Sequence, residues 1–304
     1  MSFQNAETIY APGFLRHPAV VLSDNEFALF RELIYEECGV KIGGEKRGFL
    51  ESRLRRRMAA LGVTTALEYY GVVRYSKTRM REMPALLDIL MICETSFFRN
   101  QPQFDLLNDV VLPEIINHKL RANSRLLRLW SAGCSTGQEP YSAAMAVLER
   151  LPDPETWNLR VFASDLSFTA LERAQAGVYS AEQIRGLREP HLSKYFHREQ
   201  DNYVVNDDLR RRVVFDYHNL KHDNGLRSLD LVFCRNVMIY FDVEEQRRLV
   251  TRFANCLLPG GYLFIGHAES LQGVSQQFAM LHRDKGIAYR FNGQGKAETR
   301  NDER

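Results

Sequence analysis

The stretch at residues 126–142, LLRLWSAGCSTGQEPYS, constrains the fold of this chain more than any other. A short apolar run ends at Trp130, and small or turn-forming residues follow it up to Gly137. A helix-like run then begins near Pro140, whose missing N–H is no loss in a first helical turn. The pattern predicts a strand, a tight loop and a helix. Doubly wound α/β folds bind nucleotides at such a loop after their first parallel strand, so we expect that fold and a nucleotide site.

An acidic residue beside this loop limits which nucleotide the site can take. A phosphate-binding P-loop needs a lysine after its last glycine, where this chain has Gln-Glu, and a dinucleotide loop needs a third glycine besides Gly133 and Gly137. The carboxylate of Glu139 instead suits a cation such as S-adenosylmethionine, which carries an ammonium and a sulfonium. Asp165 follows the next expected strand, at residues 159–163, where such folds hold ribose hydroxyls. The competing interpretation is that both acids only cap the helices that follow them.

Composition excludes several classes of protein. The chain has 304 residues, 45% hydrophobic and 26% charged, with a net charge of +2, as in globular proteins of one large or two modest domains. We find no apolar run near the length of a membrane span and no secretory signal pattern at the N-terminus. The five cysteines have no disulfide-framework or metal-ligand spacing. We therefore expect a cytoplasmic protein without a structural metal.

The N-terminal part is expected to be helical behind a loose arm at residues 1–22. Ser23 and Glu26 have the spacing of a capping box, and Gly39 ends the helix that they begin. The next expected helix, at about residues 45–61, is strongly basic, and residues 41–82 contain 11 Lys/Arg and 4 Asp/Glu. Such a face is either simply solvated or a docking surface for an acidic partner. Nucleic acid is disfavoured because no aromatic residues interleave with the arginines.

The segment at residues 92–99 leads into the rest of the chain. Thr95 and Arg99 could bind a carboxylate, or the segment could be a plain linker with Phe97 and Phe98 in the core. Residues 177–212 interrupt the α/β pattern and predict a small inserted sheet, and the tail at residues 293–304 is polar and expected to be disordered. Further strands are expected at residues 212–217, 229–233, 262–265 and 286–291, and further helices at 66–75, 78–89, 104–119, 166–176 and 242–258.

Four motifs in order resemble one known family. They are TSFFR at residues 95–99, SAGCSTGQEPYS at 131–142, FASDLS at 162–167 and CRNVMIYFD at 234–242. Together they resemble the chemotaxis receptor glutamate O-methyltransferases of the CheR type, over about residues 22–291. The resemblance implies an α/β fold of the class I methyltransferase kind, a Rossmann-like, doubly wound, seven-stranded and mostly parallel sheet. It places the catalytic domain at residues 95–292 with an inserted antiparallel β-subdomain at about 177–212, behind an all-α receptor-docking domain at residues 1–94.

The resemblance also implies an activity. Such enzymes transfer a methyl group from S-adenosylmethionine to glutamates on the cytoplasmic signalling helices of chemoreceptors, giving methyl esters and S-adenosylhomocysteine. The reaction serves adaptation in chemosensory signalling. On this basis we expect a monomeric enzyme that uses no metal, binds no nucleic acid and does not insert into membranes.

The motif positions imply roles for individual residues. Thr95 and Arg99 are expected to hold the methionine end of the cofactor, Glu139 its amino group and Asp165 its ribose. Asn219 and Leu220 are expected at the adenine, Asn236 and Val237 near the sulfur, and Tyr240 at the methyl-accepting pocket, with Arg99 and Tyr240 as the catalytic residues. The receptor is expected to dock on the basic helix through Arg53, Arg56 and Arg57.

Two departures from the family pattern change what we expect. Cys93 stands where many members have Asn, so we expect no cofactor contact of that kind there. The insertion is short between residues 195 and 212, which argues against capture of a receptor C-terminal pentapeptide at a sheet edge, a contact that some members make.

Rival functions remain open on the sequence alone. One is a non-catalytic regulator that binds S-adenosylmethionine or S-adenosylhomocysteine, and another is a methyltransferase that uses the basic helix on a different substrate. Base methyltransferases are disfavoured because residues 235–238 read Arg-Asn-Val-Met in place of Asn/Asp-Pro-Pro-Tyr. A glutamate acceptor is ionised at neutral pH, so we expect that no residue acts as a general base.

Overall fold

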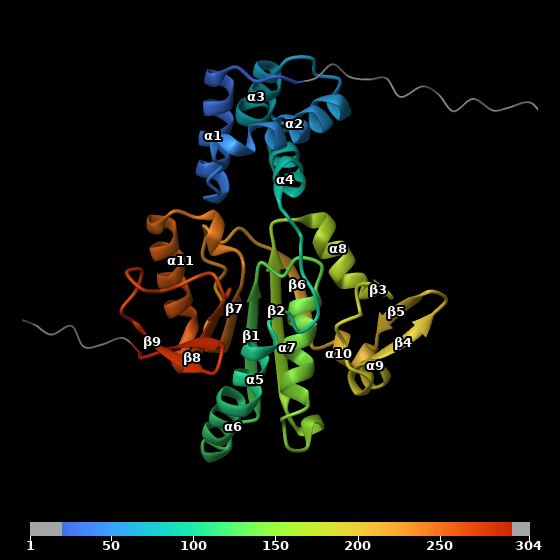
Figure 1. Ribbon diagram of the computed structural model, residues 1–304, viewed down its shortest axis with the longest axis vertical. Helices are drawn as coiled ribbons and strands as arrows, with labels where there is room; N and C mark the ends of the chain where they lie inside the picture. Colours follow the sequence, from blue (N-terminus) through green and yellow to red (C-terminus); the bar gives the residue numbers. More distant parts are fainter. Residues whose placement is uncertain (1–19, 294–304) are drawn as a thin grey trace, which may run out of the picture.

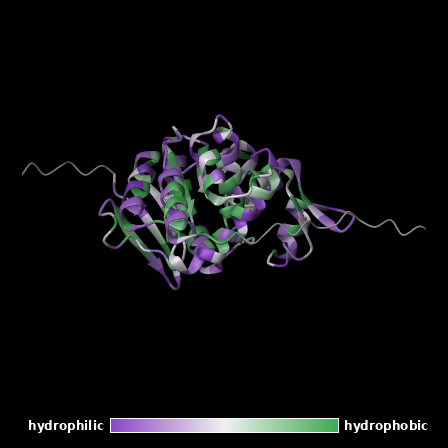
Figure 2. Cartoon of the chain, turned by 90° about the horizontal axis from the view of Figure 1, so that it is seen from above, coloured by the Kyte–Doolittle hydropathy of each residue, from purple (hydrophilic) through white to green (hydrophobic). Residues whose placement is uncertain are grey.

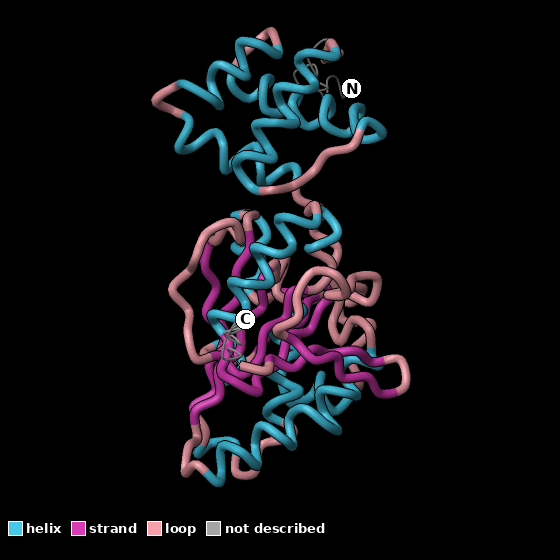
Figure 3. Tube along the Cα trace, turned by 90° about the vertical axis from the view of Figure 1, so that its left-hand side faces the viewer, coloured by secondary structure: helices cyan, strands magenta, loops and turns pink. Residues whose placement is uncertain are grey.

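The computed structural model describes residues 20–293, where a helical domain lies over one end of an α/β domain (Figure 1). The loop after the fourth helix joins the two (Figure 3). The expected arm and tail fall mostly on residues 1–19 and 294–304, which lie outside the described residues.

Amphipathic helices build the N-terminal domain around one apolar core. Its helices are α1 (Asp24–Cys38), α2 (Arg47–Leu61) after a 3₁₀ turn (Gly44–Lys46), α3 (Ala66–Tyr75) and α4 (Arg79–Leu90). Ser23 and Glu26 make both bonds of the predicted capping box, and Gly39 ends α1 with φ 76°. The core is formed by apolar side chains from all four helices, among them Phe30, Leu33, Leu50, Leu54, Tyr69 and Leu86.

The main sheet has seven strands in the order β6-β2-β1-β7-β8-β10-β9. Pairing is parallel from β6 to β8 and antiparallel on both sides of β10. The strands are β1 (Leu126–Ala132), β2 (Asn158–Asp165), β6 (Val213–Tyr217), β7 (Leu229–Cys234), β8 (Leu257–Ile265), β9 (Phe278–Arg283) and β10 (Gly286–Phe291). The expected seven-stranded, mostly parallel sheet is confirmed.

Side chains of the central strand point alternately into two cores, as the period of a strand requires. Leu127 and Leu129 join the core on one face, which α5 (Gln101–Leu106), α6 (Leu112–Arg121) and α7 (Gln138–Leu148) cover. Trp130 and Ala132 join the core on the other face with α11 (Val243–Cys256). Figure 2 shows hydrophobic residues mostly toward the interior of the molecule and hydrophilic residues mostly on its outside. A single helix was expected at residues 104–119, but a π-helical turn (Leu107–Val111) separates α5 from α6.

The insertion forms a second, antiparallel sheet in the order β3-β5-β4. It follows α8 (Phe168–Ala176) and contains β3 (Val178–Ser180), α9 (Glu189–Tyr195), β4 (Phe196–Glu199), β5 (Asn202–Val205) and α10 (Asp207–Arg210). The expected small β-subdomain is therefore present. Among the described residues, no helix combines the length and apolarity that crossing a bilayer requires.

Candidate functional site

The loop after β1 turns at a glycine, and the side chain of Val237 leaves no room for a larger residue there. Gly133 has φ 85°, and a Cβ there would lie 2.5 Å from Cγ2 of Val237 in the loop after β7. Its N–H and that of Cys134 donate to the carbonyl of Ser164 at 2.8 and 2.9 Å. These bonds hold the loops after β1 and β2 side by side at the carboxyl ends of their strands, where doubly wound folds place their ligands.

A cavity opens at this end of the sheet, between the strand loops and the helical domain. It spans about 930 Å³ not occupied by protein atoms, and part of that space is open to solvent. The predicted site residues that line it are Thr95, Arg99, Glu139, Asp165, Leu220, Asn236, Val237 and Tyr240. Other parts of the lining come from Cys38, Val40, Met91, Cys93, Gly133, Ser135, His218 and Arg235. The structure thus brings together eight residues that sequence reasoning placed at one site.

Glu139 shares a buried ion pair that the sequence analysis did not find. Its carboxylate accepts a hydrogen bond from Ser131 Oγ at 2.8 Å and lies 3.5 Å from the guanidinium of Arg235, whose side chain is 3% exposed. Burial raises the pKa of Glu139, and the Arg235 charge and the Ser131 hydroxyl oppose that rise. The carboxylate is not a helix cap, because α7 begins at the Gln before it and has no side-chain cap.

Arg235 also fixes the segment that enters the catalytic domain. Its guanidinium donates to the carbonyl oxygen of Arg99. Arg99 in turn donates from Nη1 to the carbonyl oxygen of Glu94 at 2.9 Å, which folds the linker against the cavity with Thr95 in its lining. The linker is therefore part of the cavity wall, and Phe97 is packed in the core beside it.

Asp165 is held by backbone groups of two loops. Ser135 N donates to its Oδ2 at 2.7 Å and Ser167 N to its Oδ1 at 3.0 Å. Burial raises the pKa of Asp165, and these two N–H bonds oppose the rise. The alternative in which Asp165 caps a helix from residue 166 is wrong, because α8 begins at Phe168 and Ser167 is its N-cap.

The loop after β6 presents only one of its two predicted residues to the cavity. Leu220 lines it, while the side chain of Asn219 donates to the carbonyl oxygen of Glu37, at the end of α1, at 2.7 Å. The contact of Asn219 with adenine stays a prediction. His218 also lines the cavity, and burial lowers the pKa of its imidazole.

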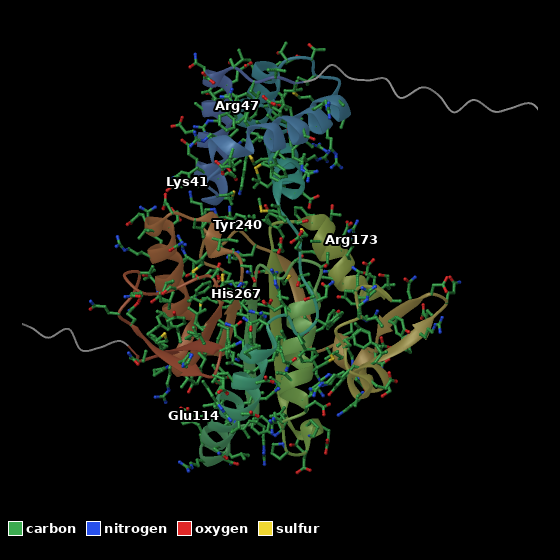
Figure 4. The ribbon with its side chains drawn as sticks, viewed as in Figure 1. Lys41, Arg47, Glu114, Arg173, Tyr240 and His267 are labelled. Carbon is green, nitrogen blue, oxygen red and sulfur yellow. The ribbon has the colours of Figure 1, made fainter. Side chains whose placement is uncertain are left out.

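The loop after β7 is anchored by Glu269, another residue that sequence reasoning missed. Its carboxylate accepts from the backbone N–H groups of Asn236 at 3.2 Å and Ile239 at 3.1 Å, and from that of Gly266. Asn236 has φ 60°, a left-handed conformation that Asn tolerates. Tyr240 follows at the boundary between the domains, near Lys41 (Figure 4). Burial raises the pKa of its phenol.

The three arginines predicted to dock a partner differ in their surroundings. Arg56 is exposed, and Arg53 is half-buried with its guanidinium 4.9 Å from the ring centroid of Phe49. Arg57 is paired inside the domain: Nε and Nη2 donate to the Glu82 carboxylate at 2.8 and 2.6 Å. In the part of the chain that the structure describes, no cluster of three or more His, Cys, Asp or Glu residues could hold a metal ion.

Comparison with known families assigns both domains. Residues 93–287 match the family described as "CheR methyltransferase, SAM binding domain", and residues 25–91 match "CheR methyltransferase, all-alpha domain". The chain is similar to chemotaxis protein methyltransferase 2 of Vibrio cholerae, 33% identical over 94% of this chain and 99% of that protein. It is 37% identical to chemotaxis protein methyltransferase 1 of Pseudomonas aeruginosa, over 87% of this chain and 97% of that protein. It is 35% identical to the Escherichia coli chemotaxis protein methyltransferase, over 86% of this chain and 90% of that protein.

Proposed function

This chain belongs to the CheR methyltransferase family, and from that premise we propose that it is a protein-glutamate O-methyltransferase of chemoreceptors. It transfers methyl groups to glutamate side chains on the receptors' signalling helices in the cytoplasm and so serves adaptation. The observation that carries the proposal is one cavity that combines two largely buried carboxylates, Glu139 and Asp165, with the candidate acceptor-site residue Tyr240.

The residues of the cavity fit the cofactor, S-adenosylmethionine, which supplies an electrophilic methyl group on a sulfonium. Burial raises the pKa of Glu139 and of Asp165, so each carboxylate favours a ligand group that offers protons or positive charge. Glu139 would hold the ammonium and Asp165 the ribose hydroxyls. The charge of Arg235 opposes the rise in the pKa of Glu139 and so favours its ionised form.

The remaining lining residues divide between the two ends of the cofactor. Thr95 and Arg99, on the folded linker, would bind the methionine carboxylate. Leu220 would pack against the adenine, with Asn219 beside it in the same loop. Asn236 and Val237 would lie near the sulfur, in the loop that Glu269 holds in place.

The acceptor would approach through a second cavity. It spans about 750 Å³, part of it open to solvent, beside the helical domain, and its lining shares Val40, Met91, Ile92 and Tyr240 with the first cavity. Lys41 and Lys46 also line it, and Lys46 Nζ lies 5.4 Å from the ring centroid of Tyr240. Glu45 is the one acidic residue in this lining, and the other lining residues besides Lys41, Lys46 and Tyr240 are apolar. The two lysines would attract a carboxylate, and the apolar walls would strip it of water next to the reactive methyl group.

The chemistry needs no proton transfer. A glutamate carboxylate is ionised at neutral pH, so the chain has only to hold it in line with the methyl group and exclude water. We assign positioning of the methyl donor to Arg99 and of the acceptor to Tyr240, and no residue acts as a base. Either residue would then affect the rate through geometry and electrostatics.

The receptor would dock on α2. Arg47, Arg57, Arg74 and Arg79 have carboxylate partners within the domain. Among the described residues the cations of α2 without such a partner within 4.0 Å are Arg53, Arg55 and Arg56. These are the charges free to attract acidic receptor helices.

The experiment that tests this function is transfer of radiolabelled methyl from S-adenosylmethionine to membranes that carry chemoreceptors. We expect label on the receptor band and its release as a volatile product in mild base, since esters hydrolyse there and N-methyl groups do not. Arg99→Ala should lose most of the transfer, and Arg121→Ala, which changes an exposed arginine elsewhere, should keep it. Cofactor binding without label on any receptor would refute the proposal.

A further inference from the structure

An aspartate of the helical domain caps a helix of the catalytic domain. Asp88, on α4, accepts from Thr169 N at 3.0 Å, from Thr169 Oγ1 at 2.7 Å and from Ser167 Oγ at 2.6 Å. Thr169 N is one of the N–H groups that α8 leaves without an intrahelical partner, and Ser167 accepts from the next, Ala170 N, at 3.0 Å. A carboxylate at this end of α8 also interacts favourably with the helix dipole.

Ser167 links this cap to Asp165, the candidate ribose ligand, through hydrogen bonds. Ser167, which donates to Asp88 through its hydroxyl, donates through its backbone N–H to Oδ1 of Asp165. Ser167 is buried, and its hydroxyl bonds both Asp88 and Ala170 N. The position of Asp165 in the cavity therefore depends on where α4 is seated.

A second contact set caps the end of α1 from the catalytic domain. Lys221 Nζ donates to the carbonyl oxygens of Tyr35 at 3.2 Å and Glu36 at 2.7 Å, and Asn219 Nδ2 to that of Glu37 at 2.7 Å. These carbonyls belong to the last turn of α1, where a cation complements the helix dipole. The same turn leads into Cys38, which lines the cofactor cavity.

The loop after β7 is also tied to the helical domain. Lys41 N donates to the carbonyl oxygen of Tyr240 at 2.9 Å, and the Tyr35 hydroxyl donates to Oδ2 of Asp242 at 2.8 Å. The end of β2 and the loops after β6 and β7 carry candidate cofactor residues. The loops after all three strands bond to the helical domain, which lies over them in Figure 1.

We propose that Asp88 and Lys221 are positioning residues for the cofactor, which act by clamping the helical domain onto the loops that bind it. Neither residue lines the cavity, so each acts through a neighbour: Asp88 through Ser167 and Asp165, and Lys221 through the seating of α1 and of the loop that carries Leu220. Since the coupling is reciprocal, a partner that shifts the helical domain changes cofactor affinity, and the cofactor changes affinity for that partner.

The test measures binding of S-adenosylhomocysteine by calorimetry, which needs no methyl acceptor and so is independent of the proposed receptor substrate. Asp88→Ala should weaken binding about tenfold, the loss expected when charge-assisted bonds that order a site are removed. Asp88→Asn, which keeps an acceptor oxygen but not the charge, should fall between it and the wild type. Asp24→Asn is the matched control, because that aspartate is on the same domain, is exposed and pairs with Arg47 away from the cavity.

Two further readouts separate positioning from a general loss of stability. The rise in Tm that S-adenosylhomocysteine produces should shrink in Asp88→Ala relative to Asp24→Asn, and the KM for S-adenosylmethionine should rise about tenfold with kcat changed less than about twofold. Lys221→Met removes the bonds to the last turn of α1 and should also weaken binding of S-adenosylhomocysteine. If Asp88→Ala does not fold, the affinity of Lys221→Met tests the proposal. Wild-type affinity in the folded Asp88→Ala protein, or in Lys221→Met if that protein alone folds, would overturn the proposal.

Discussion

Replacing Arg57 with Ala should lower the free energy of unfolding of the helical domain, whereas replacing Arg56 with Ala should leave it nearly unchanged. Both residues were predicted from the sequence to dock the receptor. In the structure Arg57 joins α2 to α4 through two bonds to Glu82, and the Tyr69 hydroxyl donates to the same carboxylate at 2.6 Å. The Glu82 side chain is 6% exposed and that of Arg57 24%.

The magnitude follows from what the substitution leaves behind. In Arg57→Ala the Glu82 carboxylate stays buried with only the Tyr69 hydroxyl as a partner. Breaking a buried ion pair in this way costs roughly 3–5 kcal/mol, and partial exposure of Arg57 lowers the expected cost to about 2–3 kcal/mol. For a chain of this size, a loss of that order lowers Tm by about 3–5 °C. Arg56→Ala, at an exposed site, should stay within about 0.5 kcal/mol of the wild type.

The assay is urea and thermal unfolding of the two variants and the wild type, followed by receptor methylation over a range of receptor concentrations. Arg56→Ala should raise the KM for receptor with Tm unchanged. Arg57→Ala should lower Tm, whether or not it also changes the KM for receptor. If the two variants unfold within about 0.5 kcal/mol of each other, the assignment of Arg57 to the domain core is refuted.

Three further predictions concern the cofactor cavity. Glu139→Gln should weaken S-adenosylhomocysteine binding by roughly 10–100-fold, the value of one charge-assisted bond. Because burial raises the pKa of Glu139 and a bound ammonium would lower it, calorimetry should show wild-type affinity falling as pH drops from neutral toward that raised pKa, and Glu139→Gln should lose this dependence. Gly133→Ala should abolish cofactor binding in the same assay, since its Cβ would meet Val237 at 2.5 Å, while Gly71→Ala, where nothing lies within 4 Å, should bind normally. Glu269→Gln should lower kcat about tenfold at saturating cofactor, because it weakens three backbone hydrogen bonds that anchor the loop after β7. An unchanged kcat would show that the loop keeps its conformation without the Glu269 carboxylate.

Local signals allowed much of the fold to be predicted. The apolar run before Gly133 and the helix-like run after it correspond to β1 and α7, and the capping box at Ser23 begins α1 where expected. These features depend on residues adjacent in sequence, where spacing and turn chemistry act directly. The residues after the first two strands of the fold predicted Glu139 and Asp165 as cofactor ligands, the family resemblance implied the same roles, and both residues line one cavity.

The contacts that organise the cavity could not be predicted in the same way. Arg235 meets Glu139 across 96 residues of sequence, Asp88 meets Ser167 across 79, and Glu269 meets Asn236 across 33. No local pattern marks such partners, because they meet only after the strands have paired. The bond from the Asn219 amide to the carbonyl oxygen of Glu37 on α1, 182 residues away, is another contact that no local pattern marks, and the contact of Asn219 with adenine stays a prediction.

The measurement that tests the central claim most directly is mass spectrometry of chemoreceptor peptides after incubation with this protein and S-adenosylmethionine. The account predicts that glutamates on the signalling helices gain the mass of one CH2 unit, because a methyl group replaces the acid hydrogen. Mild base should remove this modification, and Glu139→Gln should greatly reduce it. A methyl group found on lysine or arginine, one that survives base, or no change in any receptor peptide while S-adenosylhomocysteine still binds would contradict the account.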